Sequence, residues 1–301
     1  MKKVAINDSD SIIDSSHSIV RPFGAEQVPA AEGRADWEVE FVERRMKWIR
    51  EKVLSGKLMG GTFLNLGSSL TAEIAGQAGF DWLLIDIEHG AGGRHELLCQ
   101  LQAIESTPAA PVVRIAWNDP VLFKRVLDLG PSGIMVPYVQ SADEARRAVA
   151  AMRYPPAGIR GVAVMNRACG FGPGFDDYFK SVDSKLLTVL QIETPTAIDH
   201  VDEIAAVDGV DVLFVGPMDL SVGLGVARQW EHPTFRKALF KVGDSCQKRG
   251  KAAGTIVLNE AHIGQAVADG FSFLALSSEG AVVVNGMREL ASAFRKHQSI
   301  I

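Results

Sequence analysis

Residues 82–90 read WLLIDIEHG, an apolar run of strand length that ends in Asp86, Glu88 and His89. The same design recurs in PVVRI, TVLQIET and VLFVGPMDLS, whose polar or turn residues are Arg114, Gln191, Glu193, Gly216, Pro217 and Asp219. A buried parallel strand reads as a near-continuous apolar run. Because α/β barrels build their active sites at the carboxyl ends of such strands, the pattern predicts one barrel mouth that gathers these groups.

Alternating strands and helices fill the rest of the chain. Strands are expected at 59–64, 82–86, 112–115, 133–136, 187–192, 212–215, 252–256 and 273–276. Helical patterns fall at 70–78, 94–104, 120–127, 142–152, 197–205, 233–249, 260–268 and 283–296. Eight parallel strands with intervening helices predict an α/β fold, a (β/α)8 TIM barrel. The alternative, an open doubly wound sheet, is disfavoured because no G-x-G-x-x-G follows the first strand.

Three segments stand apart from this alternation. Residues 1–35 are polar or aperiodic and are expected to be a disordered or arm-like extension, with the barrel domain at 36–301. An apolar stripe predicts a helix over 37–54 that Gly56 ends. Residues 154–183 are rich in Gly, Pro and aromatic residues, so a long irregular loop is expected there. We expect this loop on the active-site face, as a lid or substrate-binding loop.

Composition excludes several classes of protein. The net charge is -5, which gives no basic surface for nucleic acid. No apolar stretch approaches the ~20 residues that span a bilayer, and no signal peptide is evident. Three widely spaced cysteines, Cys99, Cys169 and Cys246, argue against a disulfide framework or a cysteine zinc site. A cytoplasmic protein with no membrane or nucleic-acid partner is expected.

Glu193 and Asp219 are the first candidates for chemistry, since each follows an apolar strand. Two carboxylates with open positions suit a hard divalent cation such as Mg²⁺ or Mn²⁺, which also takes oxygens from water and substrate. The alternative is that both carboxylates cap the helices that follow. Gly216 and Pro217 place a helix N-terminus beside Asp219, where a substrate carboxylate could bind.

Asp86, His89 and Arg114 form the second group of candidates. The i, i+3 spacing lets a turn bring Asp86 to His89, and a carboxylate beside an imidazole suits a general base; the alternative is a solvent-facing turn. A guanidinium at a strand end needs an anionic or carbonyl partner. For Arg114 that partner is a substrate oxygen or, alternatively, Asp86 or Glu88 in an internal salt bridge.

These residues, in this order, resemble the HpcH/HpaI aldolase family of the phosphoenolpyruvate/pyruvate barrel superfamily. The matching segments are GTFLNLGS, DWLLIDIEHG, VVRI, LDLGPSGIMVPYVQS, YPPAGIRGV, LLTVLQIETPTAI and VDVLFVGPMDLSVGLG, with the closing helix after FLALSSEG. The resemblance covers about residues 45–297, and the 26 positions from Glu193 to Asp219 (219 − 193) match the family's metal pair. NRACGFGPGFDDYF departs from the family's usual RAxxFG stretch.

The resemblance implies a metal-dependent (class II) aldolase that cleaves or forms 4-hydroxy-2-oxo acids through a pyruvate enolate. It implies metal ligation by Glu193 and Asp219, enolate stabilisation by Arg114, and proton transfer by His89. A carboxylate of a neighbouring subunit would orient His89, and Asp128 stands at the matching position. The remaining implied roles are support of the metal waters by Asp86, a pocket lined by Gln191, and a carboxylate held around Gly216 and Pro217.

The resemblance also implies an assembly and an alternative activity. The family exchanges its last helix between neighbours and forms trimers of dimers, so a homohexamer is expected. The alternative activity is that of a macrophomate synthase-like enzyme, which decarboxylates oxaloacetate at magnesium and passes the enolate to a pyrone acceptor. A further alternative is a non-catalytic barrel that binds a small acid or acts as a scaffold. It is disfavoured because such a barrel would have to retain the polar groups by accident. A Schiff-base aldolase needs a Lys at a strand end, and Lys124, Lys180, Lys185 and Lys251 are expected elsewhere.

Overall fold

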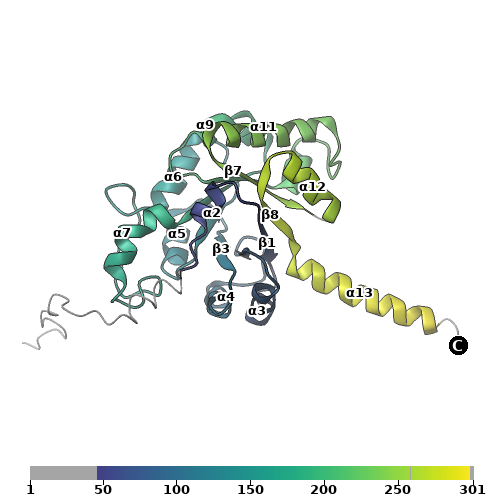
Figure 1. Ribbon diagram of the computed structural model, residues 1–301, viewed down its shortest axis with the longest axis horizontal. Coiled ribbons are helices and arrows are strands. Elements are labelled where there is room, and N and C mark those ends of the chain that lie inside the picture. The colour runs from purple at the N-terminus through teal and green to yellow at the C-terminus, as the bar shows by residue number, and fades with distance from the viewer. Residues whose placement is uncertain (1–45, 258, 299–301) are drawn as a thin grey trace, which may run out of the picture. The chain divides into compact units, whose positions relative to one another are not determined.

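The computed structural model describes residues 46–257 and 259–298 (Figure 1). The expected extension at 1–35 and the first part of the helix predicted at 37–54 lie outside these residues. In the described part of that helix, residues 46–49 are not helical and α2 (Arg50–Leu54) follows them. Gly56 then adopts a φ of 77°, the left-handed conformation expected of a residue that ends a helix.

The strands form a closed parallel barrel in sequence order, with β8 paired to β1. Their bounds are β1 (Met59–Leu64), β2 (Trp82–Asp86), β3 (Ala110–Arg114), β4 (Gly133–Val136), β5 (Leu187–Ile192), β6 (Val212–Val215), β7 (Ala252–Val257) and β8 (Phe271–Ser278). The predicted (β/α)8 barrel is therefore confirmed. The predicted strands agree with these bounds, apart from shifts of up to two residues at the ends of β3, β7 and β8.

Helices surround the barrel (Figure 1). Beyond α2 their bounds are α3 (Ser69–Gln77), α4 (Arg94–Glu105), α5 (Pro120–Leu127), α6 (Ala142–Met152), α7 (Phe175–Lys185), α8 (Pro195–Asp199), α9 (Val201–Ala205), α10 (Pro217–Gly223), α11 (Pro233–Arg249), α12 (Glu260–Ala268) and α13 (Glu279–Gln298). Side chains cap the N-termini of several helices. The side chain of Asp119 accepts the N–H of Val121 in α5, and that of Ser141 accepts the N–H of Glu144 in α6. The helix predicted at 197–205 is instead two short helices that meet at His200.

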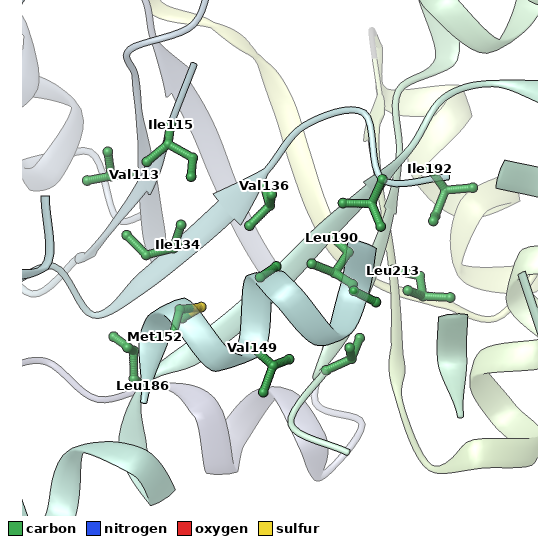
Figure 2. Close-up of a cluster of buried hydrophobic side chains, with 14 of the residues drawn as sticks. Val113, Ile115, Ile134, Val136, Val149, Met152, Leu186, Leu190, Ile192 and Leu213 are labelled. Carbon is green, nitrogen blue, oxygen red and sulfur yellow. The ribbon is translucent and has the colours of Figure 1, made fainter. Parts of the chain in front are cut away.

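Alternate residues of each strand face opposite sides of the barrel wall. In β2, Trp82 and Leu84 belong to the cluster inside the barrel, whereas Leu83 and Ile85 belong to the cluster beneath the helices. Figure 2 shows part of this outer cluster, with Ile134 and Leu190 on strands and Val149 and Met152 on α6. Since the repeat of a strand is two residues, the strands' polar end residues can be assigned to a side from their numbers alone.

Large rings inside the barrel are fitted against glycine. The indole of Trp82 stacks on Phe273, with ring centroids 4.1 Å apart and planes 9° apart. Gly61 lies directly against this indole, and a Cβ at position 61 would overlap it. The interior is thus filled by side chains rather than open, which places any binding site at the barrel's ends.

The segment 154–183 corrects the sequence prediction in two ways. Its last part forms α7, which the Gly- and Pro-rich composition concealed. The segment also connects α6 to β5, so it runs at the amino end of the barrel and not on the active-site face. Hydrogen bonds anchor it there: the N–H of Ala168 donates to the carbonyl of Asp128, and Arg167 donates to that of Leu129. A lid over this chain's own mouth is excluded.

The last helix, α13, exposes an apolar stripe. Val283, Met287, Leu290 and Phe294 are 41%, 66%, 71% and 64% exposed, and their spacing places them on one side of the helix. Figure 1 shows α13 leading away from the barrel after β8. Among the described residues, no helix is both long and apolar enough to cross a membrane.

Gly61→Ala is expected to destabilise the barrel by about 1–3 kcal/mol, because the new methyl group would displace the Trp82 indole from a closely packed interior. Urea unfolding followed by far-UV circular dichroism measures the change. Gly264→Ala is the matched control, since nothing lies within 4 Å of a Cβ added at that helical position and alanine favours a helix by about 1 kcal/mol. Equal stabilities of the two variants would contradict the packing argument.

Candidate active site

The polar residues at the carboxyl ends of the strands point into one mouth. Asp86 and Arg114 are paired in register at the ends of β2 and β3, and each continues the inward-facing row of its strand. Gln191 and Glu193 continue the inward row of β5, and Gly216 that of β6. The mouth predicted from the apolar runs is therefore built by the two-residue repeat of four strands.

Arg114 is the centre of a buried ionic network. Its Nε and Nη2 donate to the two carboxylate oxygens of Asp86, at 2.9 and 2.7 Å. Its Nη1 lies 3.1 Å from Oε2 of Glu88 and donates to Oε1 of Gln191 at 3.4 Å. The internal salt bridge, which the sequence left as an alternative, is therefore present with both carboxylates. The bidentate contact fixes the guanidinium plane and leaves Nη1 facing the mouth.

Gln191 links this network to Glu193. The side-chain amide of Gln191 donates to Oε2 of Glu193, and the backbone N–H of Tyr138 donates to Oε1 at 2.8 Å. A Cβ at Gly216 would lie 2.7 Å from Oε2 of Glu193. Glycine therefore lets the β6–α10 turn approach the carboxylate closely, which no other residue would allow without displacing it.

Asp219 lies in the first turn of α10 and is exposed. Gly216 donates its N–H to the carbonyl of Ile192, and Pro217 has no N–H. A substrate carboxylate at this turn would therefore have to use the N–H groups of the residues after Pro217.

Crowded carboxylates perturb one another in the mouth. Burial raises the pKa of Glu193 to about 7. The N–H of Tyr138 opposes this shift, the charges of Asp219 and Glu88 add to it, and Arg114 again opposes it. Near Glu193, the negative charge of the carboxylates therefore exceeds the positive charge that the chain itself supplies.

The pKa of Glu88 is raised by the same combination of burial and neighbouring carboxylates. Burial raises its pKa, against the attraction of Arg114 and His89, while Asp86 and Asp219 add to the shift. An arrangement of this kind is typical of functional sites rather than of packing. A bound cation would relieve the repulsion among the carboxylates.

The oxygen donors fit a hard divalent ion. Glu193 and Asp219 supply carboxylate oxygens on two sides of the Gly216 turn, and oxygen is the donor that Mg²⁺ prefers. Within 46–257 and 259–298, no cluster of three or more His, Cys, Asp or Glu could hold a metal ion. A two-carboxylate site would therefore have to take its other ligands from water and substrate.

His89 is not placed as the sequence predicted. Asp86 accepts the backbone N–H of His89 at 3.2 Å, so it holds the loop rather than the imidazole. The side chain of His89 is 73% exposed, and its Nε2 lies 3.9 Å from Oε2 of Glu88. The expected carboxylate–imidazole pair of Asp86 and His89 is not formed in this structure: Asp86 contacts Arg114 and the backbone of His89, while the imidazole lies beside Glu88.

Asp128 lies apart from the mouth of its own chain. It follows α5 in the outer layer of helices, in the connection that leads to the amino end of β4. Its neighbours are Asn166, which donates to Oδ1 at 3.4 Å, and Arg160 at 3.8 Å. A contact between Asp128 and an imidazole at the mouth would therefore have to cross between two copies of the chain, which stays a prediction.

Sequence reasoning did not assign a role to three residues of the mouth. Tyr138 has a φ of 57°, unusual for a bulky residue, while its N–H holds Glu193. Phe63 lies under Arg114, with Cζ 5.1 Å from the ring centroid. Glu88 was noted but not assigned. The sequence held a signal for two of these residues: Glu88 stands two positions after Asp86, and Phe63 falls at an inward position of its strand. No sequence signal predicts the contact of the Tyr138 backbone with Glu193.

A family model described as HpcH/HpaI aldolase/citrate lyase matches residues 60–286. The chain is 39% identical over 252 residues to a 4-hydroxy-2-oxo-heptane-1,7-dioate aldolase of Salmonella dublin, covering 84% of this chain and 96% of that protein. It is 41% identical over 239 residues to a 2-dehydro-3,6-dideoxy-6-sulfogluconate aldolase of Pseudomonas putida, covering 79% and 93%.

Solved structures agree with the fold. An HpcH/HpaI aldolase/citrate lyase family protein from Burkholderia cenocepacia J2315 superposes with a TM-score of 0.78 at 33% identity, covering 82% of this chain and 98% of that one. Macrophomate synthase has a TM-score of 0.70 at 24% identity, covering 84% and 90%, which is a likeness of fold alone.

In chelator-treated protein, stability is expected to fall as the pH rises through the range from the ordinary carboxyl pKa to about 7. The folded protein holds the Glu193 proton in this range and the unfolded chain releases it, so higher pH favours unfolding. The expected loss is about 3 kcal/mol at most. Urea unfolding at pH 5 and pH 8 measures it, and Glu193→Gln should reduce the difference. An unchanged difference would refute this assignment.

Proposed function

The chain belongs to the HpcH/HpaI aldolase/citrate lyase family, and we propose that it is a divalent-metal-dependent carbon–carbon lyase acting on 4-hydroxy-2-oxo acids. Cleavage would release pyruvate, or a close 2-oxo acid, and an aldehyde through the enolate. The observation that carries the proposal is the set of three mutually repelling carboxylates, Glu88, Glu193 and Asp219, beside the fixed guanidinium of Arg114. The aldolase names of the relatives support the reaction class.

Glu193 and Asp219 would hold the metal, for which Mg²⁺ is the first candidate and Mn²⁺ and Co²⁺ are the others. When bound, such an ion polarises the 2-oxo group and stabilises the developing negative charge. Gln191 and the Tyr138 N–H keep the Glu193 carboxylate in a single orientation. Asp86 stands behind Arg114 and would orient waters on the metal side of the mouth.

Arg114 would stabilise the oxygen that gains charge in the enolate. Its Nη1 faces the mouth, and its other nitrogens are fixed by Asp86, so little reorganisation is needed as charge develops. Gln191 lines the same side of the pocket. The substrate carboxylate would bind at the Gly216–Pro217 turn, close to Asp219.

His89 would carry the proton of the aldol hydroxyl group. Its exposed imidazole sits at the rim of the mouth, within reach of a substrate that enters from solvent. A carboxylate from a neighbouring copy, Asp128, would orient the imidazole and raise its pKa, as a general base requires.

We also propose a homohexamer, arranged as a trimer of dimers, in which α13 is exchanged between neighbours. The exposed stripe of Val283, Met287, Leu290 and Phe294 supports a helix that is covered by another copy. Leu70 and Ile74 on α3 are also exposed, at 65% and 61%, and offer an apolar surface of this chain for a neighbour's helix.

A cytoplasmic location completes the proposal. Cys99, Cys169 and Cys246 are all free thiols, which suits a reducing compartment.

The proposed function is tested by pyruvate release from 4-hydroxy-2-oxo acids, with EDTA and after Mg²⁺ or Mn²⁺ is restored. Glu193→Gln and Asp219→Asn are each expected to lower kcat/KM by about 100-fold or more, because each removes a charged metal ligand. Asp143→Asn, at an exposed helix position, is the control. Full activity in EDTA would overturn the metal-dependent reaction.

His89→Ala separates the aldolase from the macrophomate synthase-like alternative. Aldol cleavage needs a base for the hydroxyl proton, so it is expected to fall by about 100-fold or more. Decarboxylation of oxaloacetate needs no such base and is expected to persist. Parallel assays of both substrates measure the split, and equal loss of both activities would contradict this role of His89.

Leu290→Asp is expected to disrupt the assembly, because it places a charge in the apolar stripe of α13. Sedimentation velocity should show a smaller species, and lyase activity should fall if Asp128 acts between copies. Asn285→Asp adds the same charge outside the stripe and should leave the assembly intact. A monomeric wild-type protein would refute the homohexamer.

A further inference from the structure

Arg160 is a buried guanidinium outside the mouth. Its side chain has no exposed surface, and none of its three side-chain nitrogens has a hydrogen-bond partner within the described part of the chain. Its Cζ lies 4.5 Å from the ring centroid of Tyr154 and 5.2 Å from that of Tyr178. Burying a charge in this way is costly unless a counter-charge lies nearby.

The counter-charge is Asp128. Nη2 of Arg160 lies 3.8 Å from Oδ1 of Asp128, whose side chain is 22% exposed. Asn166 donates to the same Oδ1 at 3.4 Å, and the N–H of Ala168 donates to the backbone carbonyl of Asp128 at 3.1 Å. The carboxylate is therefore held from the side of the loop and remains open on its solvent side.

The tyrosine rings matter because their phenols are uncharged, and burial raises their pKa further. They stabilise the guanidinium through their faces but do not neutralise it as a second carboxylate would. Asp128 is thus the carboxylate within ion-pair distance of Arg160. Burial raises the pKa of Asp128, and the guanidinium of Arg160 is the largest charge that opposes this shift. The nearby ionisable groups are Lys124 and Arg94 around Asp128, and Cys169, Asp183 and the two tyrosines around Arg160.

We propose that Arg160 is a positioning residue that keeps Asp128 ionised and directed outward, so that it can pair with His89 of a neighbouring copy. The inference rests on the proposed function, in which Asp128 serves the neighbour's imidazole. Contact between copies would remove water from Asp128 and favour its protonated form. A cation that is already desolvated and held by two rings offsets this effect at little further cost.

The test follows the titration of His89 in the full-length, assembled protein. Carbethoxylation by diethyl pyrocarbonate, measured against pH on the His89 peptide by mass spectrometry, gives the midpoint. Loss of an anionic neighbour lowers the pKa of an imidazole, so Asp128→Asn should lower this midpoint by roughly one pH unit. Arg160→Met, whose side chain can pack between the rings without a charge, should give a similar shift.

Two further variants show whether Arg160 acts through Asp128. The double variant, Arg160→Met with Asp128→Asn, should shift the midpoint no further than Asp128→Asn alone. Arg160→Lys retains the charge and should keep most of the wild-type midpoint. In turnover, Arg160→Met should lower kcat for aldol cleavage and spare decarboxylation of oxaloacetate. If Arg160→Met does not assemble, Arg160→Gln replaces it, and sedimentation and thermal melting verify each variant.

Several outcomes overturn the inference. They are a wild-type midpoint in assembled Arg160→Met, an additive shift in the double variant, and no shift in Asp128→Asn. The proposed function fails in a different way. If wild-type protein cleaves no 4-hydroxy-2-oxo acid with any metal, yet the midpoints shift as described, the lyase activity is refuted while the coupling of Arg160, Asp128 and His89 stands.

Discussion

Everything in this structure depends on the two-residue repeat of strands that close into a barrel. Once β8 pairs with β1, every second residue faces a packed interior. Polar side chains are tolerated there only where the interior ends, because a buried charge without a partner is costly. Asp86 and Arg114 end the inward rows of β2 and β3, and Gln191 followed by Glu193 ends that of β5. The packing of Trp82 against Gly61 and Phe273 below them holds the wall that aligns those rows.

Electrostatics gives the mouth its chemical character. Arg114 gathers carboxylates from β2 and the loop that follows it. Burial raises the pKa of Glu193, and the charges of Asp219 and Glu88 add to this shift. The guanidinium is held by Asp86 through Nε and Nη2, and its Nη1 contacts Glu88 and Gln191. A site of this kind is pre-organised for negative charge that develops in a reaction.

A single copy of the chain leaves exposed surfaces that a second copy would cover. The apolar stripe of α13 is exposed. Asp128 is held by Arg160 and Asn166, faces outward and lies apart from the mouth of its own chain. Asp128 lies in the connection that leads to the amino end of β4, whereas α13 leads away from the barrel after β8. Assembly would join them to the proposed catalytic role of His89, so stability and activity would share one interface.

The sequence by itself determined the barrel and most of the mouth. Apolar runs of strand length are a local signal, and the residue that ends each run follows from the same signal. Contacts between residues far apart in the chain leave no comparable local pattern in the sequence. The salt bridge between Asp86 and Arg114 and the backbone of Tyr138 against Glu193 were decided by the tertiary structure. The physical reason is that repeats of two or 3.6 residues report which side of an element a residue faces, whereas a partner across the barrel is fixed only when the sheet closes.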